Sequence, residues 1–585
     1  MSNRIKEIIK NKTFSLTIQI IAILGYLIYL IDTDSYYIVY VLCALFGIYT
    51  LTYNNAKNIN YSKRKTAIYS LTSSFFTFFV LMSNYELWYF TGIPTFFHSA
   101  YKALIVSVGS ISIVWNTLIY FDCKINMQKE IERPYTMKLK WIITICFCTI
   151  SSINLTFLFV CNYPGNLTRD SISQMTQLLS GNYTNHHPFW HTMIIKLCVT
   201  IGMKLFHNIN AAVACYSVAQ IIFMSVCFTF CISTLYQLKV PSIWLVLTLC
   251  YFALMPYHIL YSFTMWKDIP FGLATLLLIT SLFRIFEDIG ERKWLNKSAL
   301  IIGSFGMCLW RSNGWIAFLL SALVFIAFFR KKYIKISILF SAVLVVTYVM
   351  IHPVLSYLEV KQPDLIESLS IPAQQIARVI VENEEISKDE RDLLSKIVEI
   401  EKIPDVYKDY ISDPVKDLVR KTANQEYLLT HKMDYLKLWI AIGLKHPLTY
   451  FKAWIDQTKG YWNGGYKYWI WSNGVEENTL GIKRNEGNPI ASLISGIFFD
   501  IIYADNMFIL FKSIGLFTWI IIACGSINLA NGKGKRAFLS VPLLAIIATL
   551  CIATPVYSEF RYAYASFTCS PMIICATFYK GKTEG

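Results

Sequence analysis

Apolar runs of about 20 residues recur along most of this chain, and each is long enough to cross the hydrocarbon core of a bilayer as a helix. Backbone groups find no water inside a bilayer, so such runs are expected to be helical. Only 15% of the 585 residues are charged and 55% are hydrophobic, whereas soluble domains are about 25% charged. The sequence therefore predicts an all-α polytopic membrane protein and excludes a disordered chain, a coiled coil and an ordinary cytosolic enzyme.

The apolar runs predict about fourteen transmembrane helices. A further stretch, 191–206, is short and interrupted by Lys196 and Lys204, so we expect an interfacial or re-entrant helix there. The expected spans are 14–31, 36–53, 67–85, 103–121, 140–160, 211–236, 242–260, 266–284, 298–311, 314–330, 336–355, 508–528, 537–553 and 562–580.

The Lys and Arg residues indicate the orientation of these spans. If the N-terminus is cytoplasmic, every loop on that side is basic, as the positive-inside rule requires. Both termini are then expected in the cytoplasm of a multi-pass cell-membrane protein. The same loops account for the formal net charge of +16, so the charge excess requires no nucleic-acid partner.

Residues 356–506 break the pattern of spans, because they mix charges of both signs and contain no cysteine. By the expected topology they form an extracytoplasmic, mainly helical domain inserted before the last three helices. The chain thus divides into an N-terminal four-helix membrane region (1–135), a seven-helix module (136–355) with an outer loop at 161–210, the inserted domain, and a C-terminal three-helix region (507–585).

Ionisable residues at membrane depth are costly, which makes them candidates for function. In this chain half of them fall in short polar motifs, each at the outer end of an expected span. The motifs are Tyr163-Pro-Gly-Asn-Leu-Thr-Arg-Asp170, Trp266-Lys-Asp-Ile-Pro270, Arg311-Ser-Asn-Gly314 and Ser558-Glu-Phe-Arg-Tyr562. The histidine run His186-His-Pro-Phe-Trp-His191 is also expected on the outer side. This grouping of acids, cations and histidines predicts a site on the extracytoplasmic face.

Some of these motifs also have purely structural interpretations. Asp170 fits the N-cap of a following helix, and such a role is compatible with catalysis. The neighbours Lys267 and Asp268, and the nearby Glu559 and Arg561, could be ion pairs that only fix helix packing.

Two other motifs could bind a ligand, and the sequence favours this only for the second. Adjacent His186 and His187 could bind a metal, but no cysteine or HxxxH spacing accompanies them, so an interfacial loop is the favoured interpretation. Arg311 precedes the helix breaker Asn313-Gly314 between two spans, and its planar guanidinium suits phosphate oxygens.

The loop 161–191 resembles the first large outer loop of GT-C membrane glycosyltransferases, which include protein O-mannosyltransferases and lipid A aminoarabinose transferases. In that fold an acidic residue comes early in the loop, and in the O-mannosyltransferase branch a Gly-aromatic element and a His-Pro motif follow. The matching order here is Asp170, Gln174, Gly181-Asn-Tyr183, His187-Pro188 and His191. From about residue 140 to the C-terminus, the motifs together also resemble an uncharacterised family of bacterial polytopic proteins.

The chain departs from the GT-C pattern in two respects. Four spans precede the seven-span module, and most relatives lack them. Asp170 is followed by Ser171, where many relatives have a second acid, so that acid is either Asp268 or absent.

The resemblance implies a GT-C-like core and a transferase that moves a sugar from a polyprenyl-phosphate donor to a cell-wall or surface glycan on the outer face of the membrane. It implies Asp170 as the general base. Candidates for binding the phosphate, sugar or acceptor are Lys267, Arg311, Arg561, His187, His191, Gln174, Asn313 and Trp266, with Asp268 and Glu559 as supporting acids. No cofactor is assigned, although a divalent cation remains open because relatives differ. The implied partners are the lipid-linked donor, the glycan acceptor and membrane lipids.

Three other functions compete with this interpretation. A transporter or flippase of lipid-linked glycans predicts charges along a path through the bilayer and broken helices in paired halves, whereas these charges gather at one face. A polysaccharide polymerase or ligase usually carries its key cations in the large outer loop, and the balanced charges of 356–506 disfavour it. An assembly scaffold would not require charged residues to cluster at membrane depth. We therefore rank the glycosyltransferase first.

Overall fold

The computed structural model describes residues 12–33, 37–57, 61–88, 93–127, 137–422, 425–464, 474–484, 489–503 and 509–580. Within these ranges the chain folds into helices, and β-structure is limited to isolated bridges. The all-α expectation is confirmed for the described residues.

Seven helical segments of the described chain are long and apolar enough to cross a membrane. An eighth arises if α10 (Ser242–Leu254) and α11 (Pro256–Ser262), which meet at a 50° bend, are counted as one broken span. The seven comprise α5 (Ile93–Met127), α6 (Leu139–Thr156) with the π-helical η2 (Phe157–Cys161), α8 (Phe189–Phe206), α9 (Ile209–Gln237), α12 (Asp268–Phe286), α15 (Ile334–Ile351) with α16 (Pro353–Tyr357), and α27 (Gly534–Phe538) with α28 (Val541–Ala553). These apolar helices indicate a membrane protein.

The expected number of fourteen spans is not confirmed. Several of the predicted spans are helices of only 15 to 17 residues, shorter than the roughly 20 that a full crossing requires. These are α13 (Lys293–Leu309), α14 (Gly314–Phe329), α26 (Ile514–Ala530) and α29 (Tyr564–Phe578).

Helix α8 is a candidate span that the sequence did not predict as one. The stretch predicted as interfacial or re-entrant forms one continuous helix of 18 residues and is among the candidate spans. Lys196 does not interrupt it, because its long side chain extends to the hydroxyl of Tyr183, 2.9 Å away. A lysine can thus keep its charge in a polar environment while its backbone stays helical.

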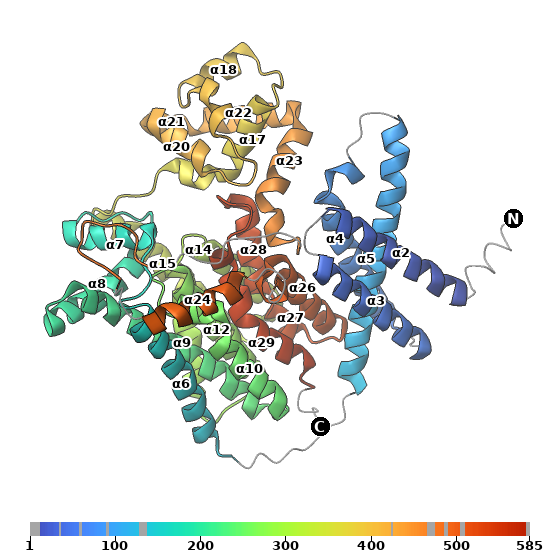
Figure 1. Cartoon of the computed structure of the whole chain (residues 1–585), viewed down its shortest axis with the longest axis horizontal. Coiled ribbons are helices and arrows are strands. Elements are labelled where there is room, and N and C mark those ends of the chain that lie inside the picture. Colours follow the sequence, from blue (N-terminus) through green and yellow to red (C-terminus); the bar gives the residue numbers. More distant parts are fainter. Residues whose placement is uncertain are drawn as a thin grey trace.

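Among the described residues, α5 and the three helices before it form a bundle of their own, shown in blue in Figure 1. Helices α2 (Lys12–Thr33), α3 (Tyr37–Lys57) and α4 (Lys63–Met82) all pack on α5, and α4 also contacts α26. At that junction the buried Asp122 carboxylate accepts hydrogen bonds from Lys65 and Asn531, each at 2.6 Å. A charged contact therefore joins this bundle to the rest of the molecule.

Helix α12 lies at the centre of the remaining bundle. It is buried along nearly its whole length and packs against α9, α13 and α29. A helix that is apolar on all sides belongs in a core. Its first residue, Asp268, is also buried, so this helix places a carboxylate at one end of the bundle.

The inserted domain, α17 to α23, has a hydrophobic core of its own and forms the yellow and orange lobe at the top of Figure 1. Its helices are α17 (Ser370–Val381), α18 (Lys388–Ser395), α19 (Ile403–Val406), α20 (Asp413–Thr422), α21 (Gln425–Thr430), α22 (Lys432–Lys445) and α23 (Pro447–Thr458), preceded by the short η3 (Leu365–Leu369). The chain then returns to the bundle through α24 (Pro489–Tyr503), which contacts α11 and η2.

Candidate functional site

Charged motifs from five separate segments meet at one end of the bundle. They are the N-terminus of α7 (Arg169–Ser180), the His187 loop (181–188), the N-terminus of α12, the turn between α13 and α14, and the Arg561 loop (554–563), which contains η6 (Phe560–Ala563). The contacts below connect these segments. They bring together residues that lie up to 391 positions apart in the sequence.

The start of α7 places Asp170. Thr168 is the N-cap and its backbone N–H donates to Ser171 Oγ, while Gly181, at a φ of +73°, ends the helix in the left-handed conformation that glycine favours. Asp170 is therefore the second residue of the helix and not its N-cap. Its carboxylate accepts a hydrogen bond from Arg561 Nη1 at 2.8 Å.

The two acids beside Arg561 differ in pKa. Burial would raise the pKa of Asp170, but the positive charges of Arg561 and Lys267 outweigh it and hold that pKa well below its ordinary value. Burial raises the pKa of Glu559 to about 7, although Arg561 Nε lies 3.5 Å from its carboxylate. At neutral pH Asp170 is ionised, whereas Glu559 is poised to titrate.

Trp266 supports Arg561. The guanidinium carbon of Arg561 lies 4.8 Å from the centre of the Trp266 ring, which is a cation–π contact. The indole N–H donates to Thr168 Oγ1 at 2.8 Å. One face of Trp266 is thus occupied by Arg561.

Lys267 and His187 form a second polar contact. Lys267 Nζ lies 2.9 Å from His187 Nδ1. Burial and the nearby Lys267 charge lower the pKa of His187 to about 2, so the ring is neutral and accepts the bond from the ammonium.

Arg311 is held between Asp268 and the Arg561 loop. Its Nη1 donates to the backbone carbonyl of Tyr562 at 2.9 Å, and its guanidinium carbon lies 4.2 Å from the centre of the Tyr562 ring. The same nitrogen is 3.2 Å from Asp268 Oδ1. That distance permits an ion pair, but neither carboxylate oxygen of Asp268 accepts a hydrogen bond of good geometry from a described residue. We therefore interpret the contact as charge neutralisation.

Asn313, in the same turn as Arg311, is fixed by a different partner. Its side-chain amide donates to Thr549 Oγ1 of α28 at 2.8 Å. This bond ties the turn between α13 and α14 to the helix that leads into the Arg561 loop.

Gln174 and His191 are both buried and bond to each other. Gln174 Nε2 lies 3.1 Å from His191 Nδ1, and His191 Nε2 lies 2.8 Å from the Tyr216 hydroxyl. With both ring nitrogens engaged inside the protein, His191 holds α7 and α8 in place and does not face a ligand.

Sequence reasoning missed the next residues of this chain of hydrogen bonds. The Tyr216 hydroxyl donates to Gln220 Oε1 at 2.9 Å, and the Gln220 amide donates to three carbonyls in the turn before Lys267, those of Tyr261, Ser262 and Thr264. A glutamine inside an apolar span was the available signal, since polar groups at that depth are costly unless they are bonded.

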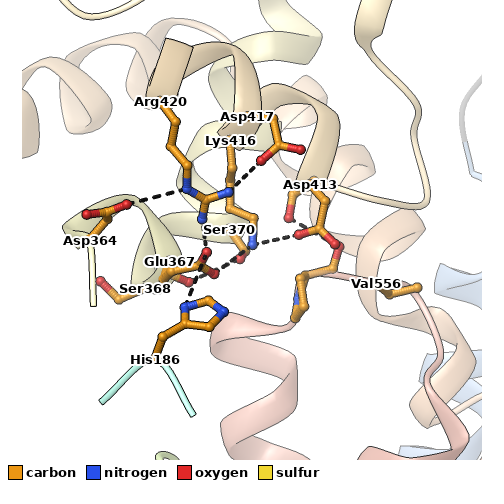
Figure 2. A network of polar contacts seen from close by, with 12 residues as sticks. His186, Asp364, Glu367, Ser368, Ser370, Asp413, Lys416, Asp417, Arg420 and Val556 are labelled. Atoms are coloured by element: carbon orange, nitrogen blue, oxygen red, sulfur yellow. Dashed lines mark hydrogen bonds and ion pairs between the residues drawn. The ribbon is translucent and has the colours of Figure 1, made fainter. Parts of the chain in front are cut away.

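The inserted domain reaches the His187 loop through a network of ions (Figure 2). His186 Nδ1 lies 4.0 Å from Glu367, and the buried Lys416 ammonium contacts both Glu367 at 3.0 Å and Asp413 at 2.7 Å. Arg420 also pairs with Glu367.

Two backbone bridges flank this network. Thr184 pairs with Lys361, and Ile411 pairs with Val556. The domain therefore contacts both the His187 loop and the Arg561 loop.

The described residues contain no group of three histidine, cysteine or acidic side chains that could hold a metal ion. The sequence left a divalent cation open, and the described acids alone do not provide a ligand set for one.

The fold and the charged end of the bundle place the chain among helical membrane proteins with several candidate spans. Residues 179–585 match the model of a family of unknown function (DUF6020), and the chain belongs to that family. The matched range includes the motifs that carry His187, Lys267, Arg311 and Arg561, and it begins after Asp170. No curated protein and no solved structure matches the chain.

Proposed function

We propose that this protein is a membrane glycosyltransferase that moves a sugar from a polyprenyl-phosphate donor to a cell-envelope glycan on the extracytoplasmic face. The observation that carries the proposal is the contact of Asp170 with Arg561 beside Lys267 at one end of the bundle. An acid that can accept a proton and cations that can bind a phosphate are the two requirements of this transfer.

The ion pair between Asp170 and Arg561 determines the sequence of steps in the proposed reaction. A donor phosphate that binds Arg561 displaces Asp170 from its partner, and the pKa of the freed carboxylate rises toward its ordinary value. Asp170 then accepts the proton of the acceptor hydroxyl, whose oxygen bonds to the sugar carbon as the bond from that carbon to the phosphate oxygen breaks. Arg561 and Lys267 stabilise the departing phosphate.

The proposal includes a GT-C-like core and the topology expected from the sequence, with about fourteen spans and both termini in the cytoplasm. The position of α7 and the His187 loop, between α6 and α8, supports the GT-C-like core. The GT-C glycosyltransferases, which the sequence resembles, carry their catalytic loop at this place. Short helices such as α13 and α14 can complete the count where the bilayer thins locally.

The arginines of the inserted domain favour a transferase over a polymerase or ligase. Arg378 pairs with Glu382 at 2.7 Å and with Asp456 at 2.5 Å, and Arg420 pairs with Asp417 at 2.6 Å. Arginines already engaged by carboxylates are poor candidates for binding a diphosphate-linked donor.

The test is transfer by the purified protein from a panel of polyprenyl-phosphate sugars, with and without a chelator. We expect Asp170→Asn to lose transfer by about 100-fold or more, the usual contribution of a general base. The matched control is Asp405→Asn, which removes an exposed carboxylate of the inserted domain and should keep transfer. Wild-type rates in Asp170→Asn, with the protein folded, would refute the role of Asp170.

A further inference from the structure

An open surface cavity of about 440 Å³ lies along one face of α7, the helix that carries Asp170. One wall is α7 itself, with Arg169, Ser173 and Thr176 on the face that lines the cavity, and the other wall carries Glu476 and Glu477. The second wall is anchored, because Leu167 and Glu476 share a backbone hydrogen bond of 2.9 Å just before α7 begins. The two glutamates are therefore held close to the start of the helix.

The cavity is adjacent to Asp170. Consecutive residues on a helix point about 100° apart, so Asp170 follows Arg169 a little more than a quarter turn around α7. Arg169 lines the cavity, while Asp170 contacts Arg561. Asp170 does not itself line the cavity, but it is the next residue along α7 after Arg169, which does.

The lining offers hydrogen-bonding groups that the protein leaves unused. The Gln177 side chain is buried and its oxygen accepts from Thr184 N at 3.0 Å, but its amide nitrogen has no partner among the described residues. The Ser173 hydroxyl likewise has no hydrogen-bond partner among the described residues. Such donors and acceptors suit the hydroxyl groups of a glycan.

The charges of the lining are unbalanced. Glu476 and Glu477 are exposed and form no ion pair with a described residue. Glu476 and Glu477 both line the cavity, and Arg169 is the one cationic residue among its described lining residues. The excess negative charge favours a ligand that carries a positive group.

From this cavity we infer the class of the acceptor: a hydroxyl-rich glycan that bears a free ammonium group. The glycan places its hydroxyls along Ser173, Thr176 and Gln177 and its ammonium between Glu476 and Glu477. The inference rests on the proposed transferase, since it names the acceptor of that site.

The test is calorimetric binding of two short probes to the detergent-solubilised full chain. One probe is a chitosan tetramer at about pH 6, where its amines are largely charged and glutamates are ionised, and the other is the fully N-acetylated tetramer. We expect the cationic tetramer to bind about fivefold more tightly, as two exposed charge contacts allow, and added salt to reduce this preference.

The variant Glu476→Gln/Glu477→Gln should bind both tetramers equally, with its affinity for the neutral one unchanged as evidence of correct folding. Asp405→Asn should keep the preference. Absent binding, equal affinities in the wild type, or a preference that survives in the double variant would each overturn the inference.

Asp170→Asn separates this inference from the proposed function, because it should keep the preference while losing transfer. Transfer that depends on Asp170, without a binding preference for the cationic tetramer, would overturn the inferred acceptor class and still support the transferase. A preference without transfer from any donor would support the cationic-glycan site and count against the transferase.

Discussion

Glu559 is the acid of the site whose charge changes near neutral pH. Burial raises its pKa to about 7, and its carboxylate lies 3.5 Å from the Arg561 guanidinium. Below that pH Glu559 is neutral, so no charge on Glu559 offsets the positive charge that Arg561 presents to a phosphate. Above that pH the ionised Glu559 carboxylate competes with the phosphate for the Arg561 guanidinium.

Donor affinity is therefore expected to fall as the pH rises through about 7. The phosphodiester of a polyprenyl-phosphate sugar does not titrate in this range, so the change belongs to the protein. We expect a loss of about fivefold, the effect of one nearby charge that is partly screened. Glu559→Gln should bind the donor tightly at both ends of the range. A pH dependence that persists in this variant would contradict the role of Glu559.

Among the structural elements, the His187 loop and the Arg561 loop are both held by the inserted domain. The network of Figure 2 centres on Lys416, whose side chain is only 2% exposed and contacts Glu367 and Asp413. Because Glu367 also faces His186, the domain is coupled to the loop that carries His187.

Lys416→Met should loosen this coupling, because it leaves the carboxylates of Glu367 and Asp413 without their shared ammonium. We expect faster hydrogen exchange in residues 181–188 and slower transfer, with the rest of the bundle unchanged. The matched control is Lys402→Met, since Lys402 pairs with Glu399 at a site where both side chains are about half exposed and such pairs contribute little. Equal exchange in the two variants would show that the network does not position the loop.

The elements of the site could be predicted from the sequence, but their partners could not. Turn residues and span ends picked out the motifs, and in the structure residues of these motifs are in contact at one end of the bundle. Lys267 and Asp268 suggested an ion pair because they are neighbours, yet adjacent helical residues do not face each other. In the structure Lys267 bonds to His187 and Asp268 lies beside Arg311. These partners depend on the packing of helices distant in the sequence, which hydropathy does not encode.

At the scale of the whole molecule, the N-terminal bundle is joined to the C-terminal helices at the Asp122 contact. The carboxylate of Asp122 is 3% exposed and bonds to Lys65 of α4 and to Asn531, which follows α26. Hydropathy could indicate four extra helices, but not which later helix they would meet.

Asp122→Asn should lower the stability of the whole molecule by about 1–3 kcal/mol, the cost of weakening buried hydrogen bonds to a charged group. Thermal unfolding of the detergent-solubilised protein measures this loss. Asp288→Asn is the control, because Asp288 is 88% exposed in its pair with Lys293 and exposed pairs contribute little. Identical midpoints for the two variants would show that the junction carries no stability.

The distance in sequence between Asp170 and Arg561 has a consequence for biosynthesis. The two residues are 391 positions apart, and Arg561 comes just before α29, the last described helix. A nascent chain that has already inserted α6 to α15 still lacks the guanidinium that pairs with its acid. The contact between Asp170 and Arg561 can therefore form only after synthesis has passed residue 561, so under the proposed function a shorter nascent chain has no complete transferase site.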